Sequence, residues 1–237
     1  LLPDQRSQDS QAAMILKQGI WRTSWNAPSL ISHRVTFLTD YQSTTYAEDY
    51  RTFVDEVRRA EEKAVPGQSA LAGAVARYLF KLMAYKDEYE VARLYSGNAF
   101  RDMLAEAFEG DYKVEFNLAP PLIAKRDPET GHLKKRSFGR GMRTLFKVLS
   151  KARKLRGTPF DPFGYTAERR QERELIKDYR ETIRDVLSHL TAHNHDLAVQ
   201  IASLPDHIRG YGHVKERNIQ HVKERERKLV SVFKAPS

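Results

Sequence analysis

An apolar helical stripe in this sequence becomes ionic towards its carboxyl end. Apolar residues recur at helical spacing over 75–83, and the same stripe continues with Lys86, Glu90 and Arg93. Residues three and four apart on a helix face one another, so the three side chains can form a network of ion pairs. Such a network either joins the helix to a neighbouring element or lines a cleft or an inter-domain surface. We expect the internal network, with Asp161 as a further member.

The segment expected to meet this network reads RGTPFDPFG, residues 156–164. Two prolines restrict its backbone and two glycines permit unusual angles, so the pattern predicts a rigid connector. Phe160 and Phe163 are expected to anchor it in the core. In the alternative interpretation, Arg156 and Asp161 are presented to a ligand.

A second glycine-containing loop, IRGYGHVK at 208–215, precedes a predicted helix. Backbone amides at the start of a helix favour anions, so this loop could hold a phosphate. The candidate contacts are Arg156, Arg209, Gly210, Gly212, His213 and Lys215. The sequence lacks the glycine spacing of a P-loop or a dinucleotide fingerprint, which favours an ordinary connector as the alternative.

Residue types that commonly perform catalysis or bind metals are sparse. Cysteine is absent, which excludes disulfides, cysteine-ligated zinc or iron–sulfur clusters and a thiol nucleophile. The best metal candidates are His189, His193, His195 and Asp196, but a predicted helix break separates them. There is no nucleophile elbow and no HExxH. We therefore expect no catalytic residue and no metal site in this chain.

Positive charge is concentrated in one segment of the 237-residue chain, whose formal net charge is +9. Residues 125–156 hold twelve Lys and Arg against two acids, which leaves 28 basic and 29 acidic residues elsewhere. Arg143, Lys147 and Lys151 align on one face of a predicted helix, and Leu145 is expected on its buried face. The strip predicts docking of an acidic partner. A merely solvated face is the alternative, and the lack of aromatic residues on the polar face argues against nucleic acid.

The elements that position these residues are expected to be mainly helical. Helical spacing predicts helices over 30–64, 69–95, 99–108, 140–155, 166–190 and 195–203, and a last helix ending at 233. Residues 112–118 alternate in polarity, and the turn DPETG follows. The expected class is mainly α, within α+β, with a small antiparallel sheet or hairpin around 112–138.

The chain is expected to contain one main domain. Residues 1–29 are interpreted as a peripheral lead-in from a preceding domain, and 30–237 as a helical domain with the small β insertion. Because the first residue is Leu, we expect a segment of a longer polypeptide. No apolar run of about 18 residues and no signal peptide are present, so a cytoplasmic protein is expected, without membrane contact.

Five long strings carry a resemblance to a known family. They are RVTFLTDYQ (34–42), KLMAYKDEYEVARLY (81–95), FNLAPPLIA (116–124), LRGTPFDPFGYTAERRQER (155–173) and LPDHIRGYGHVK (204–215). In this order they resemble the carboxy-terminal region of the fused bacterial indolepyruvate ferredoxin oxidoreductase family. The resemblance extends over about residues 30–233.

The resemblance implies oxidative decarboxylation of aryl 2-oxoacids such as indolepyruvate to an acyl-CoA, with electrons passing to ferredoxin. Thiamine diphosphate and iron–sulfur clusters supply that chemistry in the family. The family's diphosphate motif, a GDG followed by paired Asn, has no counterpart, since Gly110 and Asp111 lack the rest of it. The resemblance thus implies a non-catalytic scaffolding region that binds no cofactor itself.

The implied partners are the other domains of the same polypeptide, acidic ferredoxin at the basic strip, and the phosphates of CoA. The competing interpretation is a stand-alone basic helical module that binds an acidic partner or RNA.

Overall fold

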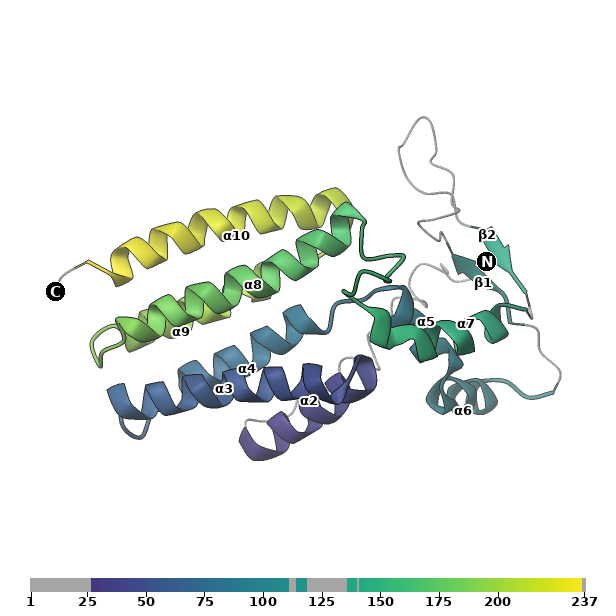
Figure 1. Cartoon of the computed structure of the whole chain (residues 1–237), viewed down its shortest axis with the longest axis horizontal. Coiled ribbons are helices and arrows are strands. Elements are labelled where there is room, and N and C mark those ends of the chain that lie inside the picture. Colours follow the sequence, from purple (N-terminus) through teal and green to yellow (C-terminus); the bar gives the residue numbers. More distant parts are fainter. Residues whose placement is uncertain (1–26, 111–113, 119–135, 140, 236–237) are drawn as a thin grey trace. The chain divides into compact units, whose positions relative to one another are not determined.

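The computed structural model describes residues 27–110, 114–118, 136–139 and 141–235 (Figure 1). Its α-helices are α2 (Ala27–Tyr41), α3 (Thr44–Ala64), α4 (Ala70–Met83), α5 (Glu88–Ser96), α6 (Asn98–Ala107), α7 (Gly141–Lys151), α8 (Ala167–Ser188), α9 (His195–Ser203) and α10 (Gly212–Phe233). Two 3-10 helices, η1 (Ala152–Leu155) and η2 (Leu204–His207), follow α7 and α9. The predicted mainly α class is confirmed. None of the described helices is both long and apolar enough to span a bilayer.

The described β-structure is a short ladder. Strand β1 (Phe116–Leu118) pairs antiparallel with β2 (Arg136–Phe138), and Phe116 lies opposite Phe138. The segment between the strands, 119–135, contains the predicted DPETG turn and lies outside the described residues. Most of the expected lead-in, residues 1–26, also lies outside them.

The described chain divides into two compact units. Unit 1 contains residues 27–40, 44–80 and 182–235, and unit 2 contains 41–43 and 81–181. The boundaries fall within or beside α2, α4 and α8, so each of these helices contributes to both units.

Unit 1 is a set of helices that lie side by side, including α3, α4, α10 and the second half of α8 (Figure 1). Its core is aliphatic and almost fully buried; it includes Leu38, Val54, Val57, Leu71, Val75, Leu79, Ile183, Val186 and Ile201. The Phe80 ring packs edge-to-face against Phe37 and Tyr50, with centroids 5.3 and 6.2 Å away. These contacts hold α2 and α3 against α4.

Unit 2 is organised around aromatic rings between α5 and α7. The buried cluster is formed by Ala92, Phe116, Met142 and Phe146. The Tyr95 ring packs against it, with centroids 5.4 Å from Phe116 and 5.7 Å from Phe146. Leu145, which the sequence placed on the buried face, is 47% exposed. That prediction is wrong because the buried face of α7 centres on Met142 and Phe146.

The predicted helix over 69–95 is interrupted at 84–87, between α4 and α5. Asp87 ends the interruption because its carboxylate accepts a hydrogen bond from the Glu90 amide at 2.8 Å and caps α5. The Tyr85 carbonyl accepts a hydrogen bond from the Tyr41 hydroxyl at 2.8 Å. The prediction that Lys86 shares a helix face with Glu90 is therefore wrong. The predicted helix over 30–64 likewise divides into α2 and α3.

Candidate functional site

Arg156 forms a buried ionic centre in unit 2. Its side chain is about 2% exposed and reaches Asp87 with two hydrogen bonds, Nε–Oδ2 of 2.5 Å and Nη2–Oδ1 of 2.8 Å. Its Nη1 donates to the Tyr41 carbonyl, and its guanidinium lies 3.6 Å from the centroid of the Tyr41 ring. Burial is the largest single influence and lowers the pKa of Arg156, but the hydrogen bond and charge of Asp87, together with Tyr41 and Tyr85, outweigh it, so the pKa lies above its ordinary value. Each of the three guanidinium nitrogens thus has an internal hydrogen-bond partner.

Asp161 organises the loop that follows Arg156. Its Oδ2 accepts from the Gly157 amide at 2.8 Å, and its Oδ1 accepts from the Phe163 amide at 3.1 Å and the Tyr89 hydroxyl at 3.0 Å. The Tyr89 and Phe163 rings meet edge-to-face at 5.3 Å. The pKa of Tyr89 is raised, first by burial and then by the hydrogen bond to the Asp161 carboxylate. One buried carboxylate therefore fixes both ends of the loop against α5.

Glycine is required at two positions of this loop. Gly157 has φ +73°, in the left-handed region that disfavours side chains. At Gly164 a Cβ would lie 2.7 Å from Asp161 Oδ2, closer than a carbon can approach. The expected rigid connector is present, and its geometry depends on the position of Asp161.

The predicted network of Lys86, Glu90, Arg93 and Asp161 is only partly assembled. Glu90 and Arg93 form a two-bond ion pair on α5, with Arg93 Nε 2.8 Å from Glu90 Oε2 and Arg93 Nη2 2.9 Å from Oε1. Lys86 is half-buried in the interruption before α5 and pairs with neither of them. Asp161 contacts Tyr89 instead.

Sequence reasoning missed Asp87, Tyr89 and Tyr41 as members of this centre. One signal was available, because Asp87 and Glu90 have the spacing of a capping box, and Asp three residues before Glu marks a helix start. That signal would have placed the helix break before Glu88.

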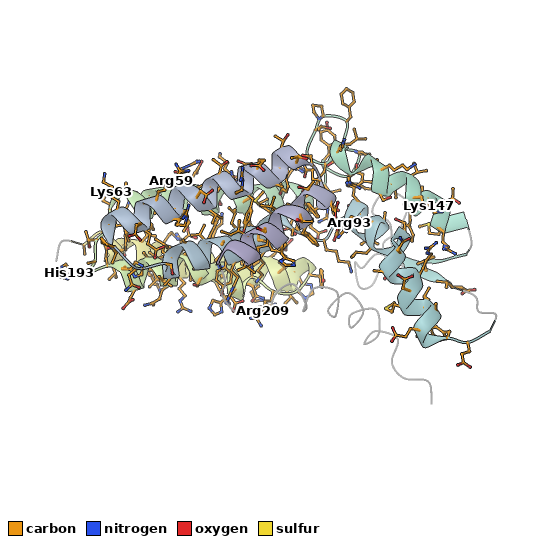
Figure 2. All side chains as sticks on the ribbon, turned by 90° about the horizontal axis from the view of Figure 1, so that it is seen from below. Arg59, Lys63, Arg93, Lys147, His193 and Arg209 are labelled. Carbon is orange, nitrogen blue, oxygen red and sulfur yellow. The ribbon has the colours of Figure 1, made fainter. Side chains whose placement is uncertain are left out.

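The α7 surface is the exposed face of α7 that comprises Arg143, Leu145, Lys147, Val148 and Lys151. The three cations follow one another at intervals of four and form one stripe. Leu145 and Val148 form a neighbouring apolar stripe, and Val148 is 60% exposed. Figure 2 labels Lys147 among the side chains of α7. The predicted alignment of the cations is present on an exposed surface.

The candidate phosphate contacts are divided between the two units. Arg156 lies in unit 2 and is buried, whereas the other five lie in unit 1. Arg209 Nη2 pairs with Asp206 Oδ2 at 3.0 Å, and the Arg209 carbonyl accepts from Asn218 at 2.8 Å. Gly210 and Gly212 have positive φ and form the turn into α10.

A buried polar cluster in unit 1 involves Glu61, which the sequence did not reveal. Its carboxylate accepts from the Leu71 and Ala72 amides at 2.8 and 2.7 Å and caps the first turn of α4. His195 Nε2 lies 2.7 Å from Glu61 Oε1, so the histidine considered for metal binding contacts a capping carboxylate instead. In the part of the chain that the structure describes, no three His, Asp or Glu side chains are arranged to bind a metal. His193 is exposed, at the end of unit 1 where Lys63 also lies (Figure 2).

Comparison with known proteins gives one family match. Residues 27–228 match the model of a family described as "Family of unknown function (DUF6537)". No curated protein and no solved structure matches the chain.

Proposed function

The chain belongs to this family of unknown function, and we propose that it is a scaffolding and docking module of a 2-oxoacid:ferredoxin oxidoreductase. The enzyme class comes from the sequence resemblance, with indolepyruvate as the substrate type. Thiamine diphosphate, iron–sulfur clusters and bond-making belong to other domains of the same polypeptide. The part assigned to this chain is to bind acidic ferredoxin at the α7 surface.

The α7 surface is the observation that carries the docking role. Met142 and Phe146 hold one face of the helix in the aromatic cluster. The opposite side presents Leu145 and Val148 directly beside the stripe of cations. Protein interfaces combine an apolar centre with a polar rim, and complementary charge accelerates association. A helix with this division of faces suits an acidic protein that also offers apolar contact.

The scaffolding role is supported by the ionic side chains of unit 2. A catalytic acid or base must come within hydrogen-bond reach of its substrate. Asp87, Glu90, Arg156 and Asp161 are buried and bonded to other side chains or to backbone. Their arrangement stabilises the interruption before α5 and the loop after Arg156.

The docking role can be tested by charge reversal. The triple variant Arg143→Glu, Lys147→Glu, Lys151→Glu is titrated against ferredoxin from the same organism over a salt series around 0.1 M, where the Debye length is about 10 Å. We expect affinity to fall at least tenfold at low salt and the salt dependence to flatten.

A matched control changes the same net charge elsewhere. Arg217, Arg225 and Lys228 are exposed on α10, and their reversal to Glu should alter affinity far less. If both triple variants weaken binding equally, attraction depends on net charge and the α7 surface has no specific role.

A further inference from the structure

We propose that the anchor loop, residues 156–165, presents Phe160 as a preformed apolar anchor that inserts into a pocket on the acidic partner. The inference rests on the proposed function, because it names the apolar contact of the same docking region. The anchor loop follows α7 and η1 directly in the chain and leads into α8.

Phe160 is the most exposed large apolar side chain of the described residues, at 81%. Tyr165, at the end of the anchor loop, is 61% exposed, and Leu155 directly before the loop is also exposed. The sequence prediction that both phenylalanines enter the core is wrong for Phe160 and correct for Phe163, which is 8% exposed. An aromatic side chain that remains in water forgoes the large favourable free energy of burial. Leu155, Phe160 and Tyr165 are together called the tip, and all three expose apolar surface to solvent.

The tip is held in one conformation by its own hydrogen bonds. The Phe160 amide donates to Thr158 Oγ1 at 3.3 Å, and the Asp161 amide donates to the Thr158 carbonyl at 3.1 Å. The Tyr165 hydroxyl donates to the Pro159 carbonyl at 2.6 Å and bridges the loop. A loop already ordered in this way loses little conformational entropy when it binds.

The base of the anchor loop is fixed independently. Asp161 bonds both ends of the loop, and Arg173 Nη2 donates to the Gly164 carbonyl at 2.7 Å. The two aromatic residues of the FDPF sequence therefore differ in role. Phe163 packs on Tyr89 and holds the loop in unit 2, whereas Phe160 makes no comparable contact. The contacts that order this loop therefore also hold Phe160 in place, although its side chain adds little to the core.

The exposed charges next to the tip in the sequence indicate the kind of partner. The exposed ionic residues of 151–170 are Lys151, Lys154, Arg170 and a single acid, Glu168. A pocket that receives Phe160 should therefore be apolar inside and acidic at its rim. This description fits the surface of an acidic protein, and we commit to ferredoxin as that partner.

The experiment compares Phe160→Ser with Tyr211→Ser. Tyr211 is also a highly exposed aromatic residue, but it precedes α10 in unit 1. In titrations with ferredoxin, Phe160→Ser should weaken binding about tenfold or more, as expected for a central aromatic anchor, and leave the salt dependence unchanged. Tyr211→Ser should bind like the original chain, and Phe160→Trp should retain most of the affinity. Melting temperatures should be equal, because Phe160 has few packing contacts.

Each contrary result shows whether the role of Phe160 or the role of the α7 surface is wrong. If Phe160→Ser binds normally while the α7 triple variant does not, the anchor is wrong and the proposed function stands. If Phe160→Ser weakens binding and the α7 triple variant does not, the anchor stands and the role of the cations is wrong. If the original chain fails to bind ferredoxin, both are wrong. If Phe160→Ser instead weakens binding to poly(U), the tip is a base-stacking platform and the anchor proposal is overturned.

Discussion

Arg156 in unit 2 and Arg34 in unit 1 are both almost completely buried, yet the pKa of the first is raised and that of the second is lowered. Arg156 has the Asp87 carboxylate, and its pKa lies above the ordinary value although burial alone would lower it. Arg34 is 1% exposed, and its Nε and Nη1 have no hydrogen-bond partner among the described residues. Burial lowers the pKa of Arg34, and Tyr50 compensates only in part.

The difference shows that the partner decides what a buried cation contributes. Both guanidiniums lie over aromatic rings, Arg156 at 3.6 Å from the Tyr41 centroid and Arg34 at 5.1 Å from the Phe80 centroid. Ring contacts are therefore common to both sites, and the carboxylate is what distinguishes them. A buried charge with a well-bonded partner tolerates burial, whereas one without is a net cost. The Arg156–Asp87 ion pair is accordingly expected to stabilise unit 2, and we refer to this pair as the joint. Arg34 is expected to give no such stabilisation.

The largest expected effect is the loss of that joint. Asp87→Ala leaves the Arg156 charge buried without a carboxylate, which costs about 3–5 kcal/mol. A chain of this size should then melt roughly 10 °C lower by calorimetry. The matched control is Asp206→Ala, which removes an exposed ion pair with Arg209 and should cost less than about 1 kcal/mol. Equal shifts in melting temperature for the two variants would show that the buried and the exposed ion pair contribute equally to stability.

A smaller loss is expected at the buried carboxylate of unit 1. Glu61→Ala removes the bonds to two amides of α4 and the contact to His195. The cost should be about 2–3 kcal/mol in chemical denaturation, because two buried amide donors are left without acceptors. Glu48→Ala removes only an exposed pair with Arg51 and provides the baseline. Matching midpoints for the two variants would show that the cap of α4 contributes nothing.

Alkaline pH tests the surroundings of the same joint. Burial, and then the charge of Asp87, raises the pKa of Tyr85 to about 12. The unfolded value is about 10, so the neutral ring is favoured in the folded state. Its contribution is complete below about pH 10 and is lost as pH rises towards 12. Tyr85→Phe should reduce the fall in melting temperature between about pH 9.5 and 11.5, and superimposable curves would contradict the assignment.

The smallest expected effect sharpens the comparison of the two arginines directly. Arg34→Met removes a buried charge that has no carboxylate, and should change stability by less than about 1 kcal/mol or increase it. Arg156→Met leaves Asp87 buried and unpaired, and should destabilise strongly. Denaturant midpoints for the pair of variants measure the difference. A loss at Arg34→Met as large as at Arg156→Met would mean that Arg34 has a stabilising role.

The sequence predicted features that depend on local spacing. The cationic face of α7, the order of the helices and the rigidity of the loop after Arg156 all follow from residues a few positions apart. The pairings that join distant segments did not follow. Arg156 and Asp87 are 69 residues apart, and Glu61 and His195 are 134 apart, so periodicity contains no information about them.

The two phenylalanines of the loop show the same limit at short range. Phe160 and Phe163 are chemically identical and three residues apart, and both were expected in the core. Asp161 between them binds the Phe163 amide and directs that ring onto Tyr89. The turn geometry, which composition does not specify, leaves the Phe160 ring in solvent.

The most direct test of the central claim is hydrogen exchange of the chain with and without ferredoxin. If α7 and the anchor loop form the docking surface, amides within 141–165 should exchange more slowly in the complex, and those of α10 should not change. Protection confined to α10, or to other segments outside 141–165, would contradict the proposed surface.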